Sequence, residues 1–274
     1  MSKWSNPVLI KELKLRFRSF KSISGLLFYL AALFVSVVGF LMLATEFTGK
    51  GFFRPDESFM MFAMLSGLQM VLVLFMTPGL TAGAISTERE KQTLNMLLTT
   101  TQSSFQIISG KLLASIAFLV LLMLAGLPLY SLVFLFGGVS PAQIVSVFMA
   151  YLITMLAVGS LGIMFSTLIR RTIVAMITTY GVMIFLSGFT AFFFFITTSF
   201  TQSMNTPVLE PLAYIWAAIN PAMVIVSLLA PEIEQELLDA TNISISLPLV
   251  YFIVYGCISI IALWIATKRL RATK

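Results

Sequence analysis

Long apolar runs separated by short polar segments set the pattern of this chain. Six of these runs contain no charged residue, and each has at least the length of about 20 residues that a helix needs to cross the hydrocarbon core of a bilayer. A helix satisfies its own backbone hydrogen bonds in lipid, so we expect helices rather than open strands. We therefore predict an all-α integral membrane protein that forms a single domain over residues 1–274. The predicted spans cover residues 23–43, 59–84, 112–136, 144–169, 173–200 and 247–267.

The placement of charge predicts the orientation of these spans. If the N-terminus lies inside and the loops alternate, all but Lys50 and Arg54 of the 17 Lys and Arg residues fall on the inner side. The acidic residues fall outside, apart from Glu12, Glu88 and Glu90. Cytoplasmic segments of membrane proteins are enriched in Lys and Arg. We therefore predict a multi-pass protein of the cell (cytoplasmic) membrane with both termini in the cytoplasm. This distribution also explains the net charge of +6 without any nucleic acid partner.

One further uncharged stretch, residues 211–230, is just long enough to span. It is interrupted by Asn220-Pro221 and followed by Pro231, and proline breaks helices. A crossing here would move the acidic residues 232–239 inside and the basic C-terminus outside, against the charge rule. We therefore predict a hairpin on the outer face within residues 208–231, and the sequence leaves open whether it is re-entrant or interfacial.

The segment before the first span has the pattern of an amphipathic helix in the membrane plane. Asn6 can cap such a helix, and Pro7 suits its first position. Its basic side would face anionic headgroups, and it serves either as a topology anchor or as a mechanical element. The apolar stripe consists of Ile10, Leu13, Phe17 and Phe20, and the neighbouring basic stripe of Lys11, Lys14, Arg18 and Lys21.

The loop over residues 85–111, between the second and third spans, carries the densest charge. Thr87 and Glu90 have the spacing of a capping box at the start of a helix. The charged head consists of Glu88, Arg89, Glu90 and Lys91, and Leu94, Leu97 and Leu98 follow at helical spacing. This pattern predicts a short amphipathic helix, whose leucines either rest on the lipid headgroups or pack against a soluble partner.

The run ISTEREKQTLNMLLTT, followed by GKLLA, resembles the cytoplasmic coupling loop of type-2 (exporter-type) ABC transporter permeases. Gln92, Asn95 and Thr101 depart from the family pattern, which has glycine, glutamate and proline at these positions. The stretch GSLGIMFSTLIRRTIVAM resembles the fourth span and following turn of these permeases, and Asn220-Pro221 stands where they often carry Asn-Pro. The matching residues of the loop are Glu88, Arg89, Glu90, Thr93, Leu94, Leu97, Leu98 and Thr100.

This resemblance implies a transmembrane permease subunit of an ATP-driven exporter. A second copy or a homologous permease would complete the substrate pathway, and a separate cytosolic ATPase subunit would bind ATP and Mg²⁺. The loop would form the coupling helix that docks this ATPase. The implied partner-coupling residues are Glu88, Arg89, Glu90, Lys91, Thr93, Leu94, Leu97 and Leu98.

Composition excludes several kinds of chemistry. The chain has no His and one Cys, and therefore no conventional transition-metal site or His-dependent serine protease. A phosphate-binding loop would need glycine at Phe105 and Ser or Thr at Leu112. Charged residues are absent from the predicted spans, which argues against a proton-coupled transporter. We therefore expect no catalytic, cofactor or metal site.

The same loop also fits a second class of protein, a non-transporting membrane scaffold or sensor that recruits a cytosolic partner. A neighbouring reading frame for an ABC ATPase would separate the two hypotheses. The sequence leaves open the substrate, the transport direction, and the choice between a homodimer and a heterodimer.

Overall fold

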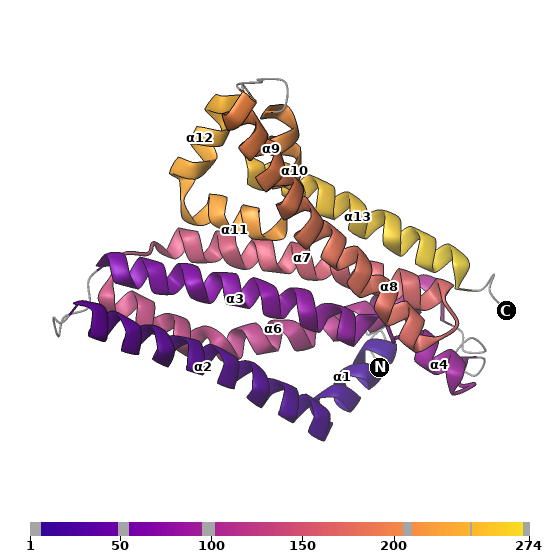
Figure 1. Cartoon of the computed structure of the whole chain (residues 1–274). Coiled ribbons are helices and arrows are strands. Elements are labelled where there is room, and N and C mark those ends of the chain that lie inside the picture. Colours follow the sequence, from indigo (N-terminus) through magenta and orange to yellow (C-terminus); the bar gives the residue numbers. More distant parts are fainter. Residues whose placement is uncertain (1–6, 49–54, 95–101, 205–209, 242, 271–274) are drawn as a thin grey trace.

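The computed structural model describes residues 7–48, 55–94, 102–204, 210–241 and 243–270, and within these ranges it is helical with no strand (Figure 1). The helices are α1 (Pro7–Phe17), α2 (Phe20–Thr48), α3 (Pro55–Thr81), α4 (Ser86–Glu90), α6 (Ser104–Phe136), α7 (Pro141–Leu168), α8 (Thr172–Ile184), α9 (Thr190–Met204), α10 (Glu210–Ile219), α11 (Pro221–Leu229), α12 (Pro231–Thr241) and α13 (Leu247–Arg269). A π-helical turn, η1 (Phe185–Phe189), joins α8 to α9.

Six stretches of the described chain are long and apolar enough to cross a membrane: α2, α3, α6, α7, α8–α9 and α13. The predicted all-α integral membrane fold is therefore confirmed, with six helical stretches that could span, or seven if the bent pair α10 and α11 crosses as one broken span. The third span begins at Ser104, earlier than the predicted residue 112. Ser103 and Gln106 cause this difference, because each side chain accepts a hydrogen bond from the other residue's backbone N–H, at 3.2 and 2.9 Å. This capping box starts the helix about two turns ahead of the apolar run.

The inner layer consists of α3, α6 and α7. In the most apolar stretch of each of these helices, 50% of the residues are buried. Helices α3 and α7 approach closely at Gly162, where an added Cβ would lie 3.2 Å from the backbone nitrogen of Ala82. Gly159 packs likewise against Leu112 and the threonines of α3. Small residues allow such backbone contact between membrane helices.

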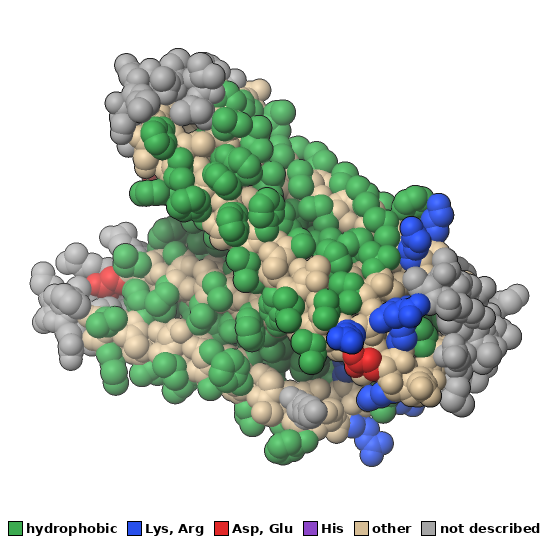
Figure 2. Space-filling view, turned by 45° about the vertical axis from the view of Figure 1, so that its right-hand side comes forward, with side chains coloured by type: hydrophobic (Ala, Val, Ile, Leu, Met, Phe, Trp, Pro, Cys, Tyr) green, Lys and Arg blue, Asp and Glu red, His purple; other side chains and the backbone are tan. Residues whose placement is uncertain are grey.

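The outer helices are α2, α8–α9 and α13; of these, α2, α8 and α13 pack against the inner layer, whereas α9 extends away from it and packs against α10 (Figure 1). In the most apolar stretches of α2, α8–α9 and α13, only 17%, 11% and 22% of the residues are buried, respectively. Large apolar side chains therefore lie on the molecular surface, among them Phe34 on α2, Phe195 on α9 and Trp264 on α13. Figure 2 shows hydrophobic side chains over most of the visible face and Lys and Arg gathered at one end. This is the surface expected of a protein surrounded by lipid or by another membrane subunit.

The predicted hairpin forms two short helices, α10 and α11, bent by 97° at Asn220. The Asn220 side chain accepts hydrogen bonds from the backbone of Ala222 and Met223 and so caps α11. Its amide nitrogen donates to the carbonyl oxygen of Ser187 in η1, at 2.7 Å. The hydroxyl of Tyr255 on α13 donates to the carbonyl of Ile219. The tip of the hairpin thus packs against the middle of other spans, which favours the re-entrant form.

Helix α12 was not predicted from the sequence. Pro231 occupies its first position, and Glu232 and Glu234 lie in its first turn, where carboxylates interact favourably with the helix dipole. The Glu234 carboxylate accepts a hydrogen bond from the backbone N–H of Leu247 at 2.9 Å. It thereby joins α12 to the first residue of α13.

Candidate functional site

The described parts of the predicted coupling loop, residues 85–94 and 102–111, lie at the end of the molecule where α3 ends, α6 and α8 begin, and α1 packs against α6. We call this surface the α4 face and define it by Glu12, Arg16, residues 85–94, Lys111 and Thr172. The chain enters it from α3 through a turn at residues 82–85. The hydroxyl of Ser166 on α7 accepts hydrogen bonds from the backbone N–H groups of Ile85 and Ser86, both at 2.9 Å. These two contacts place the start of α4 on α7.

The predicted capping box within α4 is not formed, and α4 has no side-chain cap at its N-terminus. Instead, the Glu90 carboxylate accepts hydrogen bonds from the backbone N–H and the hydroxyl of Thr172, at 2.7 and 2.9 Å. The preceding residue, Arg171, does not cap α8, so the free amides at the start of this helix favour a carboxylate from elsewhere. Glu90 therefore joins α4 to the fifth span.

Lys111 connects three helices. Its ammonium nitrogen lies 2.7 Å from the Glu12 carboxylate on α1 and 3.3 Å from the Glu88 carboxylate on α4. Lys111 itself belongs to α6 and is 5% exposed. The hydroxyl of Thr93 also donates to the Glu88 carboxylate. Because a buried ammonium needs counter-charge, this cluster ties α1, α4 and α6 together.

Arg16 and Arg89 donate hydrogen bonds to backbone carbonyls near the C-terminal ends of α3 and α7. The Arg16 guanidinium donates to the carbonyl of Leu80 in α3 at 2.9 Å and to the Ser115 hydroxyl at 2.8 Å. Arg89 donates to the carbonyl of Thr167 in α7 at 3.1 Å. Cations are favourable at helix C-termini, where carbonyl groups lack helical partners. Burial lowers the pKa of Arg16 from its ordinary value, and the charge of Glu12 acts in the opposite direction.

Leu94, the first residue of the predicted leucine stripe, is buried rather than exposed. This residue is 7% exposed and packs in a cluster with Val8, Ile108 and Leu270. It therefore holds the loop on the bundle, and the expectation that it offers its side chain to a partner has to be corrected. Leu97, Leu98 and Thr100 lie outside the described residues.

The exposed part of the α4 face consists of Glu90, Lys91, Gln92 and Thr93. Gln92 has a φ of 58°, in the left-handed region that glycine adopts without steric cost. Gln92 stands where the coupling-loop pattern has glycine, so the tight turn is kept despite the substitution. Lys91 and Gln92 lie at the apex of this turn.

The amphipathic helix predicted before the first span is α1. It ends at Phe17, so Phe20 of the predicted apolar stripe and Lys21 of the basic stripe belong to α2 instead. Ile10 and Phe17 are exposed, as expected for side chains that rest on lipid. On its other side, Val8 and Arg16 attach it to the bundle. Sequence reasoning missed this attachment and the roles of Glu12, Lys111, Ser166 and Thr172. The signal for Glu12 was its position as the one acidic residue of a basic segment.

The contacts of the α4 face link α4 to α1, α6, α7 and α8. Apart from Lys91 at the exposed apex, the charged groups of this face contact one another or the ends of helices. In the ranges that the structure describes, no group of three or more His, Cys, Asp or Glu could hold a metal ion.

Comparison with known proteins identifies one family. The sequence profile described as "ABC-2 family transporter protein" matches residues 43–261. The matched range includes α4 and Lys111 and leaves out α1. No curated protein matches the chain.

Proposed function

The chain belongs to the ABC-2 family of transporter proteins, and from this premise we propose that it is the permease subunit of an ATP-driven exporter that docks separate cytosolic ATPase subunits. Its role as a membrane subunit of a transporter follows from the family. The proposal adds the docking of the ATPase, the direction of transport, and the absence of a catalytic site in this chain. ATP and Mg²⁺ would bind only to the partner.

The observation that carries the docking proposal is the connection of α4 to four other helices. Glu90 bonds α8, Ser166 of α7 bonds the start of α4, and Lys111 joins Glu88 to α6 and α1. A displacement of α4 by a closing ATPase dimer would therefore move the ends of several spans together. Such a rigid-body shift of packed elements is an established form of conformational switching.

The charge distribution supports the proposed orientation. Lys and Arg side chains gather at the α4 face, while the acidic helix α12 lies at another end of the molecule (Figures 1 and 2). Under the positive-inside rule, the α4 face would lie in the cytoplasm of a cell membrane, where an ATPase can reach it. Both termini would lie on this side.

The weakly buried outer helices support assembly with a second permease. Helices α2 and α8–α9 carry apolar side chains that the inner layer does not cover. Among them are Phe28, Phe34, Phe189 and Phe192. A second copy or a homologue would bury part of this surface and complete a substrate pathway between the subunits. The remainder would face lipid.

The test is a change at the exposed apex of the α4 face. Reversing Glu88 or Glu90 would also break contacts within the chain, so we choose Lys91→Glu. Its side chain is exposed, and a charge reversal in a docked interface should weaken ATPase binding about tenfold. Co-purification of the chain with its ABC ATPase, and ATP hydrolysis by the complex, give the readout.

Arg18→Glu is the matched control, because it makes the same change at an exposed position of the predicted cytoplasmic side. It should leave ATPase binding unchanged. The docking proposal fails if Lys91→Glu binds the ATPase as tightly as the unmodified chain. ATP hydrolysis by the isolated chain would contradict the absence of a catalytic site.

A further inference from the structure

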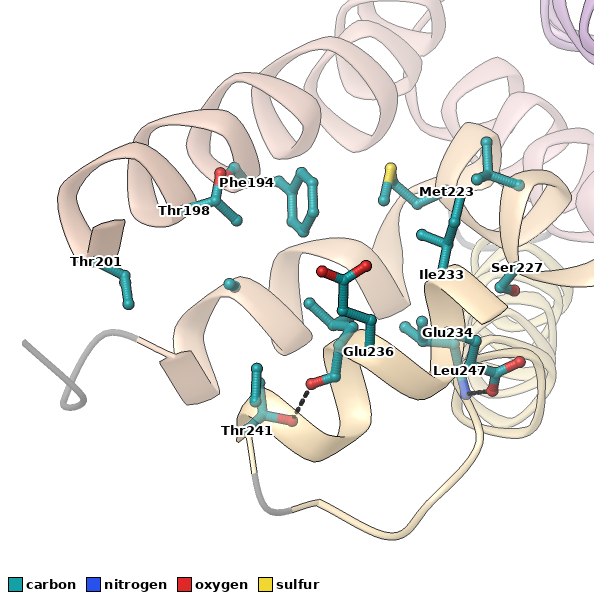
Figure 3. A pocket seen from close by; sticks show the side chains of 14 residues that line it. Phe194, Thr198, Thr201, Met223, Ser227, Ile233, Glu234, Glu236, Thr241 and Leu247 are labelled. Atoms are coloured by element: carbon teal, nitrogen blue, oxygen red, sulfur yellow. Dashed lines mark hydrogen bonds between the residues drawn. The ribbon is translucent and has the colours of Figure 1, made fainter. Parts of the chain in front are cut away.

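A cavity of about 430 Å³ is lined by α9, α10, α11, α12 and the first residue of α13 (Figure 3). These helices lie away from the α4 face (Figure 1). This volume lies within the range of about 300–1,000 Å³ found for small-molecule sites. Phe194 of α9, Met223 and Val226 of α11, and Leu237 of α12 supply apolar walls. An aromatic ring and a flexible thioether suit an irregular apolar ligand.

The polar atoms of this cavity accept hydrogen bonds and do not donate them. A hydroxyl has one proton to donate and two lone pairs. The four hydroxyl protons in the lining are used within the chain: Thr198, Thr201, Ser227 and Thr241 each donate to a carbonyl oxygen of their own helix. The other lining residues are apolar or glutamate. A ligand with donors or positive charge is therefore favoured over an anion.

Glu236 supplies the charge. Its carboxylate points into the space between Phe194 and Met223 (Figure 3). Among the described residues Glu236 makes no ion pair. By contrast, the carboxylate of Glu234 on the same helix accepts a hydrogen bond from the backbone N–H of Leu247. The lining elements all lie between Arg171 and Lys268, and this part of the sequence contains no Lys, Arg or His. The cavity thus lacks a counter-ion from its own walls.

We propose that this cavity binds a lipophilic monocation, an aromatic or alkyl ammonium or phosphonium compound of drug size. The apolar walls would take up its hydrocarbon groups, Glu236 would pair with its charge, and the ring of Phe194 would contribute a cation–π contact. This site is separate from the α4 face and needs no ATPase. The same chemistry fits either an exported substrate or a compound that arrives from outside.

The experiment uses the full chain in phosphatidylcholine nanodiscs and two probes of equal shape and opposite charge, tetraphenylphosphonium and tetraphenylborate. Equilibrium dialysis against empty nanodiscs should show saturable binding of the phosphonium and none of the borate. Glu236→Gln keeps the size of the side chain and removes its charge, and should weaken phosphonium binding about tenfold. Ala240→Trp should fill the cavity from its exposed rim and abolish binding.

Glu232→Gln is the matched control, because Glu232 is exposed on the same helix but does not line the cavity. It should bind the phosphonium as the unmodified chain does. The proposal is overturned if the phosphonium shows no saturable binding, if the borate binds equally well, or if Glu236→Gln and Glu232→Gln behave alike.

A second arm distinguishes the two sources of the cation and rests on the proposed function. The reconstituted complex with its ATPase is tested for ATP-driven transport of tetraphenylphosphonium. Transport that Glu236→Gln reduces assigns the cavity to the export pathway. Binding without ATP-driven transport assigns it to a cation from outside. Because the dialysis experiment contains no ATPase, failure of the proposed export function leaves the test of the cavity intact.

Discussion

At the scale of single residues, Lys111 is the centre of the α4 face. Its ammonium contacts Glu12 and Glu88 from two other helices, and neither partner follows from its sequence neighbourhood. Lys111→Met would remove the ammonium that both carboxylates contact and leave only the more remote charges of Arg16 near Glu12 and Lys11 near Glu88. Removing one partner of a buried pair costs about 3–5 kcal/mol, and we expect about 2 kcal/mol because the carboxylates are partly exposed. Denaturant unfolding in detergent measures this loss.

The control removes all three charges of the cluster. The triple variant Lys111→Met, Glu12→Gln, Glu88→Gln no longer places two carboxylates next to each other and should recover most of the lost free energy of unfolding. Equal stability of Lys111→Met and the unmodified chain would show that the cluster contributes nothing. Both variants should lose the connection of α1 to α4, and therefore the response of ATP hydrolysis to the permease, if that connection transmits force.

At the scale of elements, Asn220 joins the hairpin of α10 and α11 to the fifth span at its π-helical turn. It caps α11 through its side-chain oxygen and bonds Ser187 and Thr190 through its amide nitrogen. Asn220→Ser keeps an acceptor for the cap but is too short to reach Ser187. Asn220→Ala removes both interactions. We expect hydrogen exchange in residues 185–190 to increase in both variants, and exchange at the start of α11 to increase in the alanine variant alone.

The size of these effects follows from the two kinds of contact. Loss of an N-cap costs about 1 kcal/mol, and a lost buried hydrogen bond costs about 1–3 kcal/mol. The alanine variant should therefore be the less stable of the two in thermal unfolding. Unchanged exchange in residues 185–190 of Asn220→Ser would mean that the hairpin and the π-helical turn move independently.

At the scale of the whole molecule, the position of α12 decides the topology. Six spans place Asp239 of α12 outside and the C-terminus inside. Reporter fusions after Asp239 and after Lys274 test this arrangement: we expect a cytoplasmic signal only from the second. A cytoplasmic signal at Asp239 would mean that α10 and α11 together form a seventh, broken span.

The spans, the bend at Asn220-Pro221 and the amphipathic first helix could be predicted because each depends on local properties. The length of an apolar run, the presence of proline and the period of apolar side chains are written in consecutive residues. The early start of α6 could have been predicted from Ser103 and Gln106, which lie three residues apart. The acidic helix α12 was missed because its residues were considered only for their charge.

The contacts of the candidate sites required the tertiary structure. Glu90 was assigned to its own helix from its spacing to Thr87, yet it caps α8 at Thr172. Leu94 was expected at a surface and is buried against α1, α6 and the end of α13. The sequence determined that this chain is an integral membrane protein built of apolar helices, because burial in lipid selects for residue type along each run. Only the fold decided which distant carboxylate meets which amide or ammonium, because the free ends of helices take the partner that packing brings nearest.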